Sequence, residues 1–107
     1  MTKFVLVFNG GGMPETEDEQ AAVLAAWGTW YGKLGAAVVD GGNPFTPMAK
    51  TVDSDGSISD GAVGVMATGY VILQAGSLDE AAEMGTSCPH LAAGGQISVY
   101  EAIDMAM

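Results

Sequence analysis

The sequence contains very few side chains that could carry out acid–base chemistry or supply positive charge. Its 107 residues include one cysteine, one histidine and three bases, all of which are lysines. A single cysteine cannot form an internal disulfide, so nothing here requires an oxidising compartment. The apolar run near the N-terminus is too short for a signal peptide, and we therefore expect a cytoplasmic protein.

The balance of charge excludes two classes of partner. Thirteen acidic residues against three bases give a formal net charge of −10. Nucleic-acid binding depends on cations that displace counterions from phosphates, so DNA, RNA and anionic membranes would repel this chain. The uncharged stretch 61–77 contains several glycines together with Thr68 and Gln74, which argues against a membrane span. We expect neither a nucleic-acid partner nor a membrane.

Hydrophobic patterning predicts a single α+β domain over residues 1–107. Two capping boxes, each with a hydroxyl side chain three residues before a glutamate, indicate helices. The first helix is predicted from Thr16 to about Leu34 and the second from Ser77 to about Thr86. Strands are predicted at 3–8, 36–39, 65–74 and 96–103, with a small β-hairpin insert between 51 and 60.

The order of these elements is a split βαβ pattern, which predicts an antiparallel sheet with two helices on one face. The strands at 3–8 and 70–73 are apolar on both faces, although two helices can cover only one face. The uncovered face needs a partner, and the simplest partner is the same face of a second copy of this chain. The sequence therefore predicts a homodimer.

Two sets of side chains are expected to pack in the interior. The first helix has a broad apolar face, made of Val23, Leu24, Trp27, Trp30, Tyr31 and Leu34. The last strand is expected to bury Ile97, Val99 and Ile103. On the other side of the first helix, Gly28 and Gly32 either admit another backbone or ligand or are merely tolerated.

Several short motifs occur in an order that resembles a known family. They are Val39-Asp40-Gly41-Gly42 with Pro44, Ser59-Asp60-Gly61, Tyr70, Ser77-Leu78-Asp79-Glu80-Ala81 and Cys88-Pro89-His90-Leu91, within a resemblance that runs from Phe4 to about Glu101. This ordered set is similar to that of the YCII-related proteins, in particular the DGPF group. The resemblance implies a ferredoxin-like fold that dimerises as an α/β barrel.

Two departures limit what the resemblance implies about activity. The motif Asp-Gly-Pro-Phe, after which the group is named, appears here as Asp60-Gly61-Ala62-Val63. The smaller YCII members, proposed to be enzymes, pair a histidine on the first helix with an aspartate, whereas this chain has Trp27 to Tyr31 in that region. The proposed dyad therefore cannot be carried over.

His90 is the catalytic candidate because histidine is the only side chain that ordinarily titrates between pH 5 and 8. Asp40 and Asp60 follow predicted strands, and either carboxylate could orient His90 as a general acid or base if the loops converge. Alternatively, His90 caps the end of the preceding helix, and the two aspartates bond to their own turns. Cys88 fits a small buried apolar residue better than a nucleophile, because Pro89 separates it from His90.

Three functions remain open. The first is a small-molecule enzyme that uses His90 in a pocket between the sheet, the first helix and the loop 40–47. The second is a non-catalytic binding or regulatory module, whose pocket holds a small apolar metabolite and is lined by Trp27, Trp30, Phe45 or Tyr70. The third is a structural protein that acts on another protein through its dimer surface.

No cofactor and no metal site is predicted. The glycines of the loop 9–14 do not complete the dinucleotide-binding pattern, because Glu15 stands at the third glycine position. Cys88, His90 and an aspartate would supply only three ligands of mixed type, without a recognisable spacing for a metal ion.

Overall fold

The main sheet has four antiparallel strands in the order β2-β5-β1-β6 in the computed structural model, which describes residues 2–12 and 14–105. These strands are β1 (Thr2–Asn9), β2 (Val38–Asp40), β5 (Ala67–Ala75) and β6 (Gln96–Glu101). The central strand β1 pairs with β5 on one side and β6 on the other. This is the ferredoxin-like arrangement of a split βαβ fold, and it confirms the predicted fold class.

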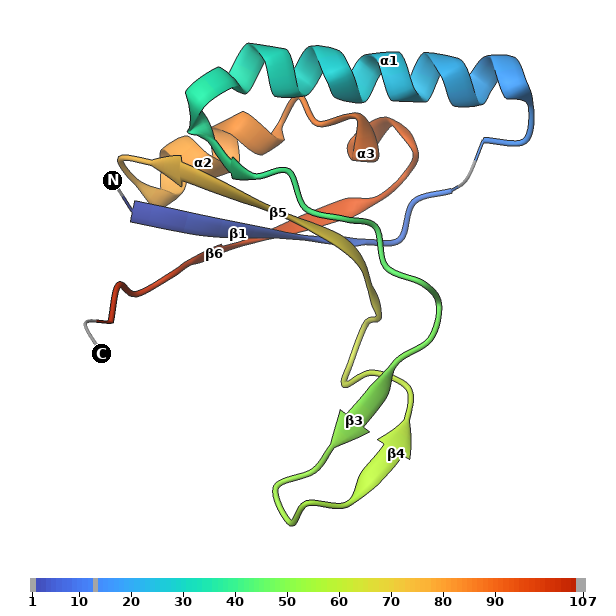
Figure 1. The fold of residues 1–107 in the computed structure, drawn as a ribbon, viewed down its shortest axis with the longest axis vertical. Coiled ribbons are helices and arrows are strands. Elements are labelled where there is room, and N and C mark those ends of the chain that lie inside the picture. The colour runs from blue at the N-terminus through green and yellow to red at the C-terminus, as the bar shows by residue number, and fades with distance from the viewer. Residues whose placement is uncertain (1, 13, 106–107) are drawn as a thin grey trace.

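Helices cover one face of this sheet (Figure 1). They are α1 (Glu17–Leu34), α2 (Leu78–Gly85) and the one-turn helix α3 (Pro89–Ala92). Both predicted capping boxes form their N-cap bonds: Thr16 Oγ1 accepts from the Glu19 N–H at 3.1 Å, and Ser77 Oγ accepts from the Glu80 N–H at 3.1 Å. Acidic residues in both first turns stabilise the positive helix ends.

A further helical turn, α3, follows α2 and begins at a proline. Proline has no N–H to donate, and its fixed φ suits the first position of a helix. Cys88 is the N-cap of α3, and Pro89 begins it. Pro89 therefore starts a new helical turn as well as preventing α2 from continuing, and His90 lies in the first turn of α3.

The core lies between the sheet and the helices. Along β1, Phe4, Leu6 and Phe8 are buried, whereas the side chains between them are only half-buried on the opposite face. The strand β5 adds Val71, Leu73 and Ala75, and α1 adds Trp30. The alternation follows from the two-residue repeat of a strand, which sends successive side chains to opposite faces.

Three of the residues predicted to be buried are in fact exposed, and Val23, at 38%, is the least exposed of them. Leu24 is 73% exposed, because the first half of α1 extends past the ends of the strands (Figure 1). Ile103 is 83% exposed, because β6 ends at Glu101. The prediction was correct for Ile97 and Val99, which pack against the core.

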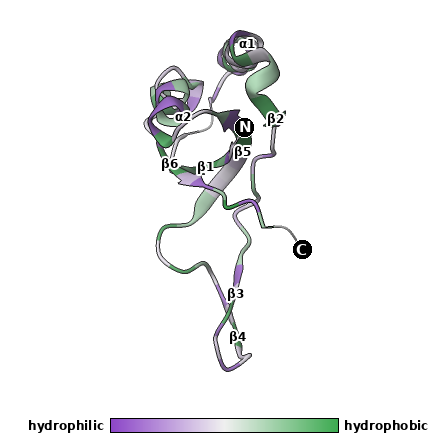
Figure 2. Cartoon of the chain, turned by 90° about the vertical axis from the view of Figure 1, so that its left-hand side faces the viewer, coloured by the Kyte–Doolittle hydropathy of each residue, from purple (hydrophilic) through white to green (hydrophobic). Residues whose placement is uncertain are grey.

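The structure has two further features that no helix covers. We call the sheet face that is turned away from the helices the open face; it carries Val5, Val7, Tyr70, Ile72, Gln74, Ser98 and Tyr100. We call residues 46–66 the arm; it contains the predicted hairpin, formed by β3 (Lys50–Val52) and β4 (Ile58–Asp60). These two strands form a separate sheet, and the arm projects on the side of the open face (Figure 2).

Candidate functional site

His90 joins α3 to the end of the central strand. Its Nε2 atom lies 2.9 Å from the backbone oxygen of Asn9, and its ring stacks on Phe8 with centroids 5.0 Å apart. Gly11 and Gly95 lie against the ring, so closely that a Cβ atom added to Gly11 would be 2.7 Å from Cε1. His90 therefore does not cap α2, which corrects the alternative that the sequence left open.

The bond to Asn9 determines which ring nitrogen of His90 could act as an acid or base. A carbonyl oxygen only accepts hydrogen bonds, so Nε2 carries a proton and donates it to this bond. In the neutral ring, Nδ1 is then the nitrogen with a free lone pair. Any acid–base role of His90 must use Nδ1.

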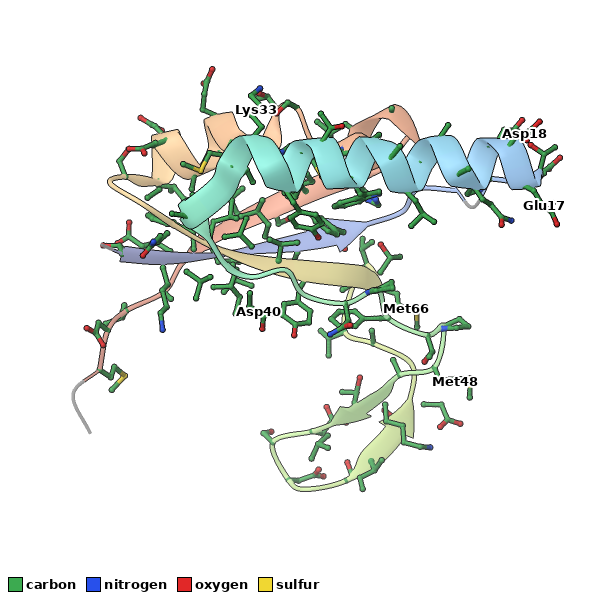
Figure 3. The ribbon with its side chains drawn as sticks, turned by 45° about the horizontal axis from the view of Figure 1, so that its top comes forward. Glu17, Asp18, Lys33, Asp40, Met48 and Met66 are labelled. Atoms are coloured by element: carbon green, nitrogen blue, oxygen red, sulfur yellow. The ribbon has the colours of Figure 1, made fainter. Side chains whose placement is uncertain are left out.

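Asp40 ends the edge strand β2 and points to the open face (Figure 3). Its Oδ1 atom accepts a hydrogen bond from the Gly42 N–H at 2.8 Å, which is the expected behaviour of an aspartate in a turn. Its other oxygen, Oδ2, lies 3.5 Å from the hydroxyl of Tyr70. This second oxygen therefore remains available to a bound molecule.

Asp60 lies in the arm, where it pairs with a base rather than with its own turn. Its Oδ1 atom is 2.6 Å from Lys50 Nζ across the hairpin, and both side chains are exposed. Exposed ion pairs of this kind contribute at most about 1 kcal/mol to stability.

The structure does not bring the three catalytic candidates together. His90 lies in α3, which packs near β6, whereas Asp40 ends β2 at the opposite edge of the sheet. Asp60 lies in the arm, far from α3 (Figure 1). The group that orients His90 is the Asn9 carbonyl, a backbone atom that no residue pattern identifies.

The four aromatic residues predicted to line one pocket lie on two sides of the sheet. Trp30 is buried under α1, where its Nε1–H donates to the Met84 oxygen at 3.0 Å. Trp27 packs in the same layer, with its ring 5.6 Å from those of both Phe8 and Trp30. These two tryptophans form part of the helix-covered side of the sheet.

Phe45 and Tyr70 lie on the other side, next to Asp40. Their rings stack with centroids 5.7 Å apart and planes inclined by 23°. The Phe45 N–H donates to the Thr68 oxygen at 2.8 Å, which holds the loop beside β5. We call Asp40, Phe45 and Tyr70 the Asp40 cluster.

Tyr31 is a positioning residue that sequence reasoning missed, because it was assigned only to the apolar face of α1. Its hydroxyl donates to the Gly41 oxygen at 2.8 Å and so ties the turn beside Asp40 to α1. Burial raises the pKa of this hydroxyl, with further contributions from Cys88 and Asp40, so it stays protonated as the bond requires. The phenol of Tyr31 thus supports the Asp40 cluster from the helix side.

Cys88 is buried, as the sequence predicted. It is 3% exposed, and burial raises the pKa of its thiol to about 11. A thiol with so high a pKa is almost entirely protonated near neutral pH and is a poor nucleophile.

Two shallow grooves of about 610 and 580 Å³ run along the helix layer. Residues of α1 and α2 line the first, and residues of α1 and α3 line the second; Lys33, Thr86 and Ser87 are common to both. Neither His90 nor any member of the Asp40 cluster lines them.

The fold is similar to that of a solved enzyme. This is 5-chloro-2-hydroxyhydroquinone dehydrochlorinase (TftG) from Burkholderia phenoliruptrix AC1100, in complex with 2,5-dihydroxybenzoquinone. The likeness covers 94% of this chain and 93% of that chain, with 19% identity and a TM-score of 0.55. It shows a shared fold. No protein-family model matches this chain, and no curated protein matches it.

Two further observations concern residues 2–12 and 14–105. No three histidine, cysteine, aspartate or glutamate side chains in these ranges are grouped so that they could hold a metal ion. No helix in the same ranges has the length and apolar character needed to cross a membrane.

Proposed function

We propose that this protein is a homodimer that binds a small, uncharged aromatic compound at the Asp40 cluster. The single observation that carries the ligand assignment is the position of Asp40 and Tyr70 beside the exposed ring of Phe45 on the open face. Phe45 is 47% exposed, so its ring offers a surface on which a second ring can stack.

The polar atoms of the Asp40 cluster favour a ligand that donates a hydrogen bond. The separation of 3.5 Å between Asp40 Oδ2 and the Tyr70 hydroxyl is long for a bond between two oxygens, which is usually about 2.7–2.8 Å. Each atom can therefore make a shorter bond to a ligand hydroxyl. A neutral phenol has both the ring and the donor, whereas an anion would be repelled by Asp40 and by the net charge of −10.

The open face supports the dimer. Its apolar side chains include Val5, Val7 and Ile72, which are only half-buried in one copy of the chain. The seven side chains that define the middle of this face are uncharged, and two charged side chains of opposite sign flank them: Asp40 on the edge strand β2 and Lys3, which pairs with Gln74. Two acidic copies can therefore meet at this face with little local repulsion, and burial of its apolar area would stabilise their association.

The comparison with a solved structure guides the choice of probe. The dehydrochlorinase with the same fold was solved with 2,5-dihydroxybenzoquinone, a planar ring with two hydroxyl groups. Each hydroxyl group of that compound is conjugated with a quinone carbonyl, like the hydroxyl of a carboxylic acid, which makes it more acidic than a simple phenol. Hydroquinone has a similar outline and stays neutral, so it is the first probe for this chain.

Calorimetric titration with hydroquinone tests the proposal. We expect Asp40→Asn and Tyr70→Phe each to weaken binding by about tenfold. This is the effect expected when a ligand hydroxyl loses one hydrogen bond, to the Asp40 carboxylate or to the Tyr70 hydroxyl. Tyr100→Phe is the matched control, because it removes a hydroxyl from the same face beyond β1 and should leave the affinity unchanged. Equal affinities in all four proteins, or no binding by the wild type, would refute the ligand assignment.

We also propose that the chain is a diverged relative of the YCII-related proteins. The ordered motifs around Asp40, Asp60 and His90 support this relationship, and so does the ferredoxin-like fold. The likeness to the dehydrochlorinase adds support for the fold.

A second candidate is a small-molecule enzyme in which His90 is the acid or base. The observation that favours it is the bond from Nε2 to Asn9, which orients the ring and leaves Nδ1 for chemistry. The general base would then need no carboxylate partner. Such a site would lie at α3 and be distinct from the Asp40 cluster.

Exchange of ring protons of 1,2,4-trihydroxybenzene with D₂O, followed by NMR, tests this second candidate, because acid–base catalysis accelerates such exchange. His90→Gln keeps a donor near the position of Nε2 but removes the basic nitrogen. We expect His90→Ala and His90→Gln both to abolish the acceleration while His90→Gln keeps the stability. Acceleration that survives in His90→Gln would exclude His90 as the acid or base.

A further inference from the structure

The arm is an ordered apolar element that its own chain leaves uncovered. Val52 and Ile58 face each other across the hairpin and are 68% and 67% exposed. Met48, Val63 and Val65, at the base of the hairpin, are also exposed. An isolated two-stranded hairpin is only marginally stable in water, and exposed strand edges invite pairing with other chains. The arm therefore has the composition of a contact surface.

The arm makes the molecule larger than its length requires. The radius of gyration is 15.4 Å, compared with about 13 Å for a compact domain of this length. The longest dimension is 46 Å and runs from the helices through the sheet to the arm, whereas the shortest is 19 Å (Figure 1).

The arm and the open face lie on the same side of the sheet, so a partner that binds one would also contact the other. It projects on the side of the sheet opposite to the helices, and this arrangement is visible both along and across the strands (Figures 1 and 2). Its base continues directly from Phe45, which stacks on Tyr70 of the open face. The open face and the arm thus form one continuous surface with a corner between them. Whatever covers the open face must also lie beside the arm.

We infer that the arm packs against the side of a second copy of this chain, with Val52 and Ile58 in the contact. This inference rests on the homodimer of the proposed function and adds a second contact to it. In a two-fold dimer the contact occurs twice, because each copy extends one arm along the other. Ser59, on the opposite face of the hairpin, is exposed and stays outside this contact.

Protection of an introduced thiol tests this inference. Val52→Cys and Ser59→Cys place a thiol on the two faces of the hairpin, and native Cys88 is too buried to compete. We expect iodoacetamide to modify Val52→Cys slowly when the protein is concentrated enough to be dimeric, and rapidly after dilution to the monomer. Ser59→Cys should react rapidly at both concentrations.

The dimer dissociation constant gives an independent measurement, by light scattering or sedimentation. Ile58→Lys should raise this constant by about tenfold or more, whereas Ser59→Lys should not change it. Circular dichroism confirms that each variant is folded. A stable dimer with Val52→Cys fully reactive would overturn the role of the arm and leave the homodimer intact. A chain that stays monomeric at every concentration would overturn both.

Discussion

His90 Nε2 and the backbone oxygen of Asn9 lie 2.9 Å apart and join two segments that are 81 positions apart in the sequence. The bond fixes the imidazole ring in the space between the loop after β1 and the turn before β6. Gly11 and Gly95 border that space, and the His90 ring leaves no room for a side chain at either position. His90 therefore requires glycine at positions 11 and 95, whether or not it also takes part in catalysis.

Gly95→Ala should destabilise the protein by about 1–3 kcal/mol, because the added methyl group would overlap the His90 ring. In a His90→Ala background, the same substitution should have far less effect. Urea unfolding of the four proteins in this double-mutant cycle measures the coupling directly. Gly12→Ala is the control, since no described residue other than its chain neighbours lies within 4 Å of its new Cβ. Additive effects in the cycle would refute the steric role of His90.

Gly42→Ala should be among the most damaging substitutions, with a loss of about 3 kcal/mol or more. Gly42 has a φ of +69°, and a Cβ atom there would overlap the Tyr70 carbonyl, a backbone group that cannot move aside. Gly28→Ala provides the contrast, because its Cβ would meet open space in α1 and should stabilise the helix by about 1 kcal/mol. Thermal unfolding should show a lower midpoint temperature than the wild type for Gly42→Ala and a higher one for Gly28→Ala.

The sequence predicted most of the fold because its signals are local. Thr16 and Ser77 mark the starts of both long helices through bonds to residues only three positions away. The alternation of Phe4, Leu6 and Phe8 along β1 is also a local signal, and it shows which face of the strand packs in the core. Leu24 could not be predicted to be exposed, because its exposure depends on where the strands end beneath α1.

The candidate site was less predictable because its contacts join distant segments. Residue types identified His90 and Asp40, but whether they meet depends on strand order, which places β2 and β6 at opposite edges. Phe45 and Tyr70 were grouped with Trp27, although the pleat of β5 sends Tyr70 to the open face. The bond from Tyr31 to Gly41 has no sequence signal, because its acceptor is a backbone carbonyl.

Neutralising Asp60 should have little effect. Asp60→Asn removes an ion pair with Lys50 in which both side chains are exposed, so we expect a change of less than about 1 kcal/mol in the free energy of unfolding. Hydroquinone affinity should also stay unchanged, since Asp60 lies in the arm and outside the Asp40 cluster. Denaturant unfolding and calorimetry measure the two quantities. A large loss of affinity would place the arm at the ligand site.

Stability should fall in alkaline solution in a way that depends on Cys88. Burial raises the pKa of this thiol to about 11 in the folded protein, whereas an unfolded cysteine titrates near about 8.5–9. The folded state therefore holds more protons than the unfolded state between these values. The contribution to stability is fully present below about pH 8.5 and is lost as the pH rises towards about 11.

Urea unfolding of the wild type and of Cys88→Ala, at a series of pH values from neutral to strongly alkaline, isolates this effect. Groups that do not interact with Cys88 act equally in both proteins, so the difference between the proteins reports the thiol together with its contribution to the raised pKa of the Tyr31 hydroxyl. We expect the wild type to lose its advantage over Cys88→Ala as the pH rises, because only its unfolded state gains from ionising a thiolate. A constant difference across the series would mean that Cys88 reaches solvent in the folded protein. Its thiol should then also react quickly with iodoacetamide near neutral pH, contrary to its burial beneath α1.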